Sequence, residues 1–262
     1  GDRVFIGSLN HWVYSFDTDS GCAHWAFEAE FRIRSNVAVS DGVIVFGDTG
    51  ANAYALNAET GQLKWRHKVD YTPTARVNGK VMLHDGVAYV PVTNYQEVLN
   101  MGGRTLEFPC CTARGAVAAY DLHTGERKWK TYTIDQRSEF IGLTPNGVNR
   151  YGPSGVTVFS GLTVDEKRGV IYVPTANQQT EPVIEESDAI IALDMKTGAK
   201  VWVKGLAPEH MGGQDVYHLG CEAWVDSERK TCSPLNPKGQ GDRDIVAPAI
   251  LVERQDGKEV LL

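Results

Sequence analysis

Several common functional signatures are missing from this 262-residue chain. It contains no C-x-x-C-H motif, no G-x-G-x-x-G motif after a strand, no H-E-x-x-H motif and no G-x-S-x-G motif. These patterns mark covalent haem attachment, dinucleotide binding, zinc-dependent proteolysis and serine hydrolysis. Their absence argues against all four functions, and a haem that accepts electrons would have to lie outside this sequence.

Long hydrophobic runs and excess positive charge are also lacking. No segment approaches the roughly 18 apolar residues that a membrane helix needs. The net charge of −7 makes nucleic acid an unfavourable partner. The remaining composition, with 42% hydrophobic residues and 27 glycines, is typical of a soluble, turn-rich all-β protein that buries a sizeable core.

One phrase occurs four times along the chain. Each copy joins an alternating apolar run to an Asp or Asn, a glycine and a tryptophan. The copies are VYSFDTDSGCAHW from Val13, AYALNAETGQLKW from Ala53, VAAYDLHTGERKW from Val117 and IIALDMKTGAKVW from Ile190. The alternation predicts strands with one buried face, and the Asp or Asn with a glycine four residues later predicts a hairpin turn. Another strand candidate precedes each copy, so every repeat is an antiparallel unit.

Such a unit cannot bury its hydrophobic face alone, so the repeat predicts a β-propeller of four-stranded antiparallel blades. Gly21 and Gly61 are 40 residues apart, and blades recur at about 40–50 residues. Later intervals are longer because of polar, glycine-rich insertions, at Asn94–Arg114, Thr133–Gly155 and Gln178–Ser187. Insertions of this kind either decorate a scaffold or build its functional face.

We expect residues 1–262 to form a single, partial propeller domain. Its repeats end near Trp25, Trp65, Trp129 and Trp202, and a fifth blade begins near Ile245. Strand candidates at both ends, Asp2–Ser8 and Lys258–Leu262, indicate a segment of a larger ring. A closed four-bladed ring is the alternative.

The five cysteines are the sharpest chemical signal. Cys110 and Cys111 are adjacent within the insertion of the third repeat. A disulfide between neighbours would form a small, rigid ring suited to cover a planar ligand, whereas two free thiols or two long-range bridges are the alternatives. Cys221 and Cys232 enclose a short polar loop and pair naturally in an oxidising compartment, which leaves Cys22 over.

Taken together, three features resemble the pyrroloquinoline-quinone (PQQ)-dependent alcohol dehydrogenases, and most closely their polyvinyl-alcohol dehydrogenase-like members. They are the repeat, the C-C-T-A-R-G run, and the segment GPSGVTVFSGLTVDEKRGVIYVPTANQ at Gly152–Gln178. The resemblance implies about half of an eight-bladed ring in a periplasmic or secreted protein. It also implies hydride transfer from an alcohol to bound PQQ, with electrons passing to a cytochrome c or another acceptor. Non-catalytic propellers of outer-membrane assembly lipoproteins share the repeat, so a scaffold is the alternative.

The resemblance also implies a set of quinone contacts. In the family, the quinone lies between the vicinal disulfide and a tryptophan, and Phe159 stands in the position of that tryptophan. Arg76 and Arg114 stand where a guanidinium would pair with the quinone carboxylates. Ser154 lies within G-P-S-G, whose glycines allow a close approach of the backbone. A core aromatic and surface salt bridges are the alternative roles for Phe159 and the arginines.

Calcium and a catalytic base are implied in the same way. Asn177 matches the asparagine that binds calcium in the family, while Cys110 stands in place of the expected glutamate. The expected aspartate aligns with Tyr217–His218. We therefore expect His218 as the proton acceptor, with Asp215 as the second candidate. A hydrogen-bonded loop histidine is the alternative role for His218.

Overall fold

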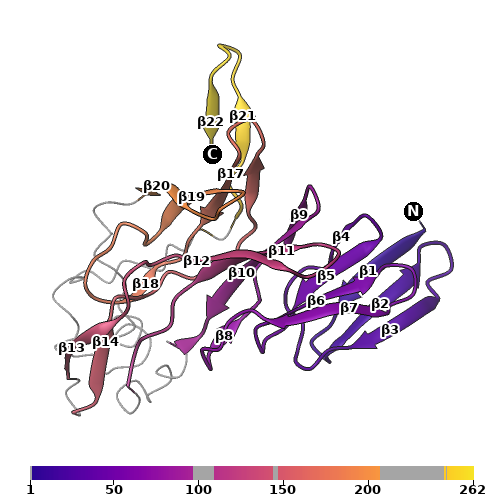
Figure 1. Ribbon diagram of the computed structural model, residues 1–262, viewed down its shortest axis with the longest axis horizontal. Helices are drawn as coiled ribbons and strands as arrows, with labels where there is room; N and C mark the ends of the chain where they lie inside the picture. The colour runs from indigo at the N-terminus through magenta and orange to yellow at the C-terminus, as the bar shows by residue number, and fades with distance from the viewer. Residues whose placement is uncertain (1, 97–108, 144–146, 207–244, 246) are drawn as a thin grey trace, which may run out of the picture.

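The computed structural model describes residues 2–96, 109–143, 147–206, 245 and 247–262 (Figure 1). Antiparallel β-strands form its sheets, which follow one another in chain order from the N-terminal sheet to the C-terminal hairpin. Within these residues, no helix is long and apolar enough to cross a membrane. The prediction of an all-β fold is confirmed.

Each repeated phrase forms the last two strands of one sheet. The first two sheets contain, in order, β1 (Arg3–Gly7), β2 (Trp12–Asp17) and β3 (Ala23–Glu28), then β4 (Ala38–Ser40), β5 (Val43–Gly47), β6 (Asn52–Asn57) and β7 (Leu63–Lys68). The third contains β9 (Met82–His84), β10 (Val87–Asn94), β11 (Ala116–Asp121) and β12 (Arg127–Tyr132), with β8 (Ala75–Arg76) paired to the end of β10. The fourth contains β16 (Thr163–Asp165), β17 (Val170–Pro174), β19 (Ala189–Asp194) and β20 (Lys200–Gly205), and β21 (Leu251–Glu253) pairs with β22 (Glu259–Leu261).

The hairpin turns form as the sequence predicts. Asn57 shows the pattern, because its Oδ1 accepts the backbone N–H groups of Glu59 at 2.9 Å and Thr60 at 2.8 Å. Gly61 follows with a φ of 72°. Asn and Asp favour such side-chain-to-backbone bonds, and glycine adopts positive φ without steric cost. The same arrangement recurs at the other three copies.

Tryptophans connect each of the first three sheets to the sheet that follows. The indole N–H of Trp25 donates to Ala58 O at 3.1 Å, that of Trp65 to Leu122 O at 3.0 Å, and that of Trp129 to Met195 O at 3.0 Å. Every acceptor directly follows the Asp or Asn of the next repeat. The spacing between the Asp or Asn and the tryptophan is the same in every copy of the phrase, and it therefore determines how one blade docks on the next.

The hydrophobic core lies between neighbouring sheets. One cluster joins the first and second sheets through Val13, Phe46 and Tyr54. A second joins the second and third sheets, and a third cluster joins the third and fourth. Central strands such as β5 and β17 are buried along their whole length because sheets cover both of their faces. Their continuous apolar runs follow from that position.

The insertions contain more regular structure than the sequence suggests. The insertion Thr133–Gly155 forms a hairpin of β13 (Glu139–Leu143) and β14 (Asn149–Gly152), where loops were expected. Phe140 on β13 packs edge-on against Tyr151 on β14, with ring centroids 6.1 Å apart. Further along, β15 (Ser154–Gly155) pairs with β18 (Gln178–Thr180). These short strands position the candidate site.

Candidate functional site

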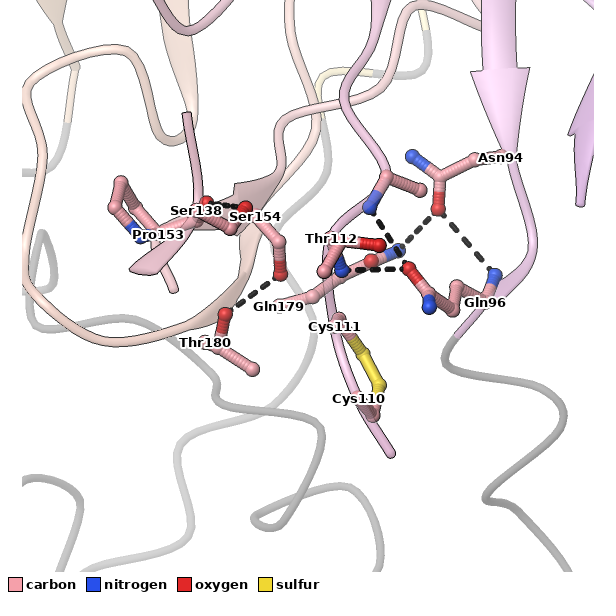
Figure 2. Close-up of a disulfide and its surroundings, with 11 residues drawn as sticks. Asn94, Gln96, Cys110, Cys111, Thr112, Ser138, Pro153, Ser154, Gln179 and Thr180 are labelled. Carbon is pink, nitrogen blue, oxygen red and sulfur yellow. Dashed lines mark hydrogen bonds between the residues drawn. A yellow bond between two sulfur atoms is a disulfide. The ribbon is translucent and has the colours of Figure 1, made fainter. Parts of the chain in front are cut away.

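Cys110 and Cys111 form a disulfide, and both residues are fully buried (Figure 2). The peptide bond between them is cis. Their backbone pairs with β14, since Cys110 N–H donates to Asn149 O at 3.2 Å, Tyr151 N–H to Cys110 O at 2.7 Å and Cys111 N–H to Tyr151 O at 3.1 Å. Cys22 is an exposed free thiol, while Cys221 and Cys232 lie outside the described residues.

Ser154 lies in a second segment of the site, where Oγ of Ser154 and Oγ1 of Thr180 are 2.6 Å apart. Both residues are fully buried. At Gly155, φ is 89°, and an added Cβ would lie 2.7 Å from the backbone nitrogen of Gln179. Only glycine fits this close approach. Here the glycine admits the neighbouring strand β18, while the expected close approach of G-P-S-G to a ligand stays a prediction.

Backbone hydrogen bonds connect three segments of the site. Gly155 N–H donates to Ala113 O at 2.8 Å, which joins the G-P-S-G segment to the chain after the disulfide. Val156 N–H donates to Asn177 O at 3.0 Å, which joins it to the end of Y-V-P-T-A-N. The structure therefore brings together the surroundings of three predicted site residues, Cys111, Ser154 and Asn177.

Sequence reasoning missed three amide side chains beside the disulfide, of which Asn94 and Gln179 are buried and Gln96 is partly buried. Gln179 Nε2 donates to Asn94 Oδ1 at 3.0 Å, and Gln96 Oε1 accepts the backbone N–H groups of Thr112 and Ala113, each at 2.8 Å. Figure 2 shows Gln179 reaching from the Thr180 side of the site toward Asn94. The sequence offered only a weak indication of these residues, namely that each amide lies at or just after a strand beside an insertion.

The other predicted quinone ligands contact different segments. The guanidinium of Arg76 lies over the ring of Tyr95, 4.8 Å from its centroid. The guanidinium of Arg114 lies over the ring of Tyr132 at 4.0 Å and donates to the backbone carbonyls of residues 134–136. The backbone of Phe159 lies against Gly79. A cation–π contact therefore holds each guanidinium, and carbonyl hydrogen bonds also hold that of Arg114.

Carboxylates that could bind calcium do not gather within the described part of the chain. No three His, Cys, Asp or Glu side chains of the described residues lie together as a metal site. Asn177 is the predicted ligand that remains there. His218 and Asp215, the predicted bases, and Tyr217 lie outside the described residues.

Charged groups surround a cavity of about 520 Å³ beside the candidate site. Its lining includes Arg114, Lys130, Tyr132, Asp135 and Lys200. Lys200 forms ion pairs with Asp135 at 3.0 Å and with Glu186 at 3.1 Å. Lys130 pairs with Asp70, so carboxylates of the chain neutralise both lysines of the cavity, whereas Arg114 contacts backbone carbonyls.

The arrangement around the disulfide suits a planar ligand with polar edges. Cys110 and Cys111 form a small, rigid ring that is fully buried. Buried hydroxyl and amide groups of Ser154, Thr180 and Asn94 lie on segments that meet beside it. The Nδ2 of Asn94 is buried and has no hydrogen-bond partner among the described residues. Apolar surfaces combined with a few fixed polar groups are typical of small-molecule sites.

Comparisons with known proteins agree with this description. Residues 90–207 match the model of the glucose/ethanol/alcohol dehydrogenase β-propeller domain, and residues 9–146 match the model of outer membrane protein assembly factor BamB. The chain is 35% identical over its whole length to a polyvinylalcohol dehydrogenase of Sphingopyxis sp. (strain 113P3), and 33% identical over 84% of its length to one of Pseudomonas sp.. It spans 39% and 35% of the lengths of these two relatives.

A solved structure shows the same fold. The quinohemoprotein alcohol dehydrogenase of Comamonas testosteroni superimposes on 99% of this chain with a TM-score of 0.63, at 18% sequence identity. The superposition covers 38% of that protein.

Proposed function

This chain belongs to the PQQ β-propeller family, and from that premise we propose that it is part of a quinoprotein alcohol dehydrogenase. The buried Cys110–Cys111 disulfide, held beside Ser154 and Asn177, carries the proposal. A propeller that serves only as a scaffold has no need for a rigid flat ring among buried polar groups. The relatives named polyvinylalcohol dehydrogenases favour a secondary or polymeric alcohol, such as polyvinyl alcohol, as the substrate.

PQQ, when bound, would accept the hydride from the alcohol carbon. The chain would supply the flat face through Cys110 and Cys111 and polar contacts through Ser154 and Asn94. The buried position of these groups would exclude water and fix the plane of the quinone. Arg76 and Arg114 would bind its carboxylates only after exchanging the contacts described above.

The catalytic base, the metal and the electron acceptor are finer parts of the same proposal. His218 is the proposed proton acceptor, with Asp215 as the second candidate, because a base is needed at the reacting hydroxyl. Calcium is proposed through the family and Asn177 alone. A cytochrome c is proposed as the acceptor and the periplasm as the compartment.

The proposal is tested with the complete protein, reconstituted with PQQ and calcium. We expect an alcohol-dependent reduction of an artificial electron acceptor, and a change in PQQ absorbance on binding. The Cys110→Ser/Cys111→Ser variant is expected to bind PQQ about tenfold more weakly, because it loses the rigid ring. A Cys22→Ser variant is the matched control, since Cys22 is exposed and unpaired. Absence of PQQ binding to the wild-type protein would refute the enzyme proposal.

A non-catalytic scaffold is the second candidate, and the match of residues 9–146 to the BamB model favours it. That match covers most of the first three sheets, in which the tryptophan-docking phrase dominates. The disulfide segment lies within the same range, but its backbone hydrogen bonds extend to residues 149, 151 and 155, beyond the BamB match. A protein that binds no quinone but captures a partner protein would support the scaffold.

A further inference from the structure

Gln96 binds the backbone of the two residues that directly follow the disulfide. Its Oε1 accepts the backbone N–H of Thr112 and that of Ala113, both at 2.8 Å. Two consecutive amides that converge on one oxygen fix the direction of the backbone directly after Cys111. Ala113 is buried, so its N–H would be costly to leave without an acceptor.

Gln96 is itself tied to the other side of the site. Its backbone N–H donates to Asn94 Oδ1 at 3.3 Å, and the same oxygen accepts Gln179 Nε2 at 3.0 Å. Asn94 ends strand β10 and is only 2% exposed. Gln179 belongs to β18, which pairs with the strand that carries Ser154. One buried oxygen therefore joins the disulfide segment to the Ser154 segment (Figure 2).

The disulfide is thus held from two sides. Backbone hydrogen bonds to β14 hold Cys110 and Cys111 on one side. Gln96 holds the chain that follows on the other side. Without the Gln96 acceptor, the chain after the disulfide would lose two hydrogen bonds and keep the bond from Gly155 N–H to Ala113 O, so the ring would be held less firmly on this side.

We propose that Gln96 is a positioning residue of the quinone site, which fixes the plane of the Cys110–Cys111 ring relative to Ser154 and Gln179. The link to quinone binding rests on the proposed function. The effect on the ring itself does not, because it follows from hydrogen bonds of the chain. Neither the cysteine pair nor the repeat marks Gln96 as a functional residue.

Three variants of the complete protein test the proposal. Gln96→Leu removes the acceptor at similar volume, and Gln96→Glu keeps an oxygen that can accept both amides. Gln62→Leu is the matched control, because Gln62 is an exposed glutamine in a turn of the second sheet. The first readout is the dissociation constant of PQQ from an absorbance titration. The second is the rate at which dithiothreitol reduces the Cys110–Cys111 disulfide in the quinone-free protein, followed by alkylation and peptide mass spectrometry.

Gln96→Leu is expected to raise the dissociation constant and the reduction rate, each by about tenfold. Gln96→Glu and Gln62→Leu are expected to stay within about threefold of the wild type in both readouts. Unchanged values for Gln96→Leu would overturn the proposal. Equal losses for Gln96→Leu and Gln96→Glu would also overturn it, because the acceptor oxygen would then not be the cause.

A double-variant cycle separates positioning from general stability. In a Cys110→Ser/Cys111→Ser background, Gln96→Leu is expected to cause no further loss of PQQ affinity, because its effect passes through the ring. A further loss of the same size would refute the positioning role. If Gln96→Leu fails to fold, Gln96→Asn, which withdraws the oxygen by one methylene, replaces it. If the wild-type protein binds no PQQ, the proposed function fails, and the reduction rates alone decide the role of Gln96.

Discussion

At the scale of single residues, the ion pair between Asp70 and Lys130 stands out because it joins two blades. Asp70 follows β7 in the second sheet and is 3% exposed, while Lys130 lies on β12 of the third sheet. Lys130 Nζ also donates to Val69 O at 2.9 Å. Burial by itself raises the pKa of Asp70, but hydrogen bonds from Lys130 and Thr72 outweigh it and leave this pKa below its usual value.

The Lys130→Met variant is expected to destabilise the protein by about 3–5 kcal/mol near pH 7, because it leaves a buried carboxylate without its cation. A carboxylate with a lowered folded-state pKa stabilises the fold above its unfolded-state pKa, near 4, and this contribution is lost as the pH falls through the folded-state value. The difference from the wild type should therefore narrow as the pH falls below 4. Urea unfolding at pH 7, 4 and 3 measures this narrowing. A difference that is constant with pH would contradict the assignment.

The adjacent cysteines drew attention to the site, and the resemblance to the PQQ-dependent family favoured a disulfide between them, whereas nothing in the sequence pointed to Gln96. From adjacency alone, two free thiols or two long-range bridges were equal alternatives. Gln96 lies just after strand β10 and belongs to no recognisable sequence motif. Its role as an acceptor depends on backbone amides 16 and 17 residues away. Arg114 shows the same limit: its sequence position suggested a carboxylate partner, but its guanidinium contacts the carbonyls of residues 134–136.

At the scale of elements, the turn glycines meet two requirements at once. Gly125 has a φ of 75°, and an added Cβ would lie 2.6 Å from Cγ of Trp65. Gly61 and Gly198 have the same relation to Trp25 and Trp129. The glycine of each repeat therefore permits the turn and also admits the tryptophan of the preceding blade.

Gly125→Ala and Gly86→Ala separate these two requirements. Gly86 has a φ of 68°, and an added Cβ there would meet nothing within 4 Å. We expect Gly86→Ala to lower the free energy of unfolding by about 1–2 kcal/mol, because alanine is strained in the left-handed backbone conformation. Gly125→Ala is expected to cost about 1–3 kcal/mol more, because the methyl group overpacks the docked indole. Urea unfolding of both variants measures the difference, and equal costs would show that docking does not constrain Gly125.

Elements of the repeat were predictable because local chemistry determines them. The turn at Asn57 is closed by hydrogen bonds within three residues, so its sequence is sufficient. The hairpin β13–β14 was not predicted, since its strand β14 also pairs with the disulfide segment some 40 residues earlier in the chain. Contacts of that range leave no periodic pattern.

At the scale of the whole molecule, apolar side chains remain exposed at both ends of the series of sheets. Val4 and Ile6 are exposed on β1 of the first sheet. Trp202 is 40% exposed and lines an apolar cavity of about 660 Å³ with Pro248 and Leu262. These surfaces correspond to the faces that other blades bury against their neighbours.

The isolated segment of residues 1–262 is therefore expected to self-associate. Exposed apolar patches and unpaired sheet edges favour association between copies. Light scattering after size-exclusion chromatography should show an apparent mass that rises with concentration. The Ile6→Lys/Trp202→Lys variant is expected to lower that mass, and the exposed-turn variant Gln62→Lys is the control. A concentration-independent monomer would contradict the expectation.

The bond between Asn94 and Gln179 has a consequence for the order of folding. These residues are 85 positions apart, and contacts of such sequence separation form late because a long loop must close first. The third and fourth blades can each form from local hairpins, but the disulfide surroundings are complete only when both have docked. Binding of the proposed quinone would then mark the last stage of folding. Before that stage, a newly made chain would have folded blades that are not yet docked and that cannot bind the quinone.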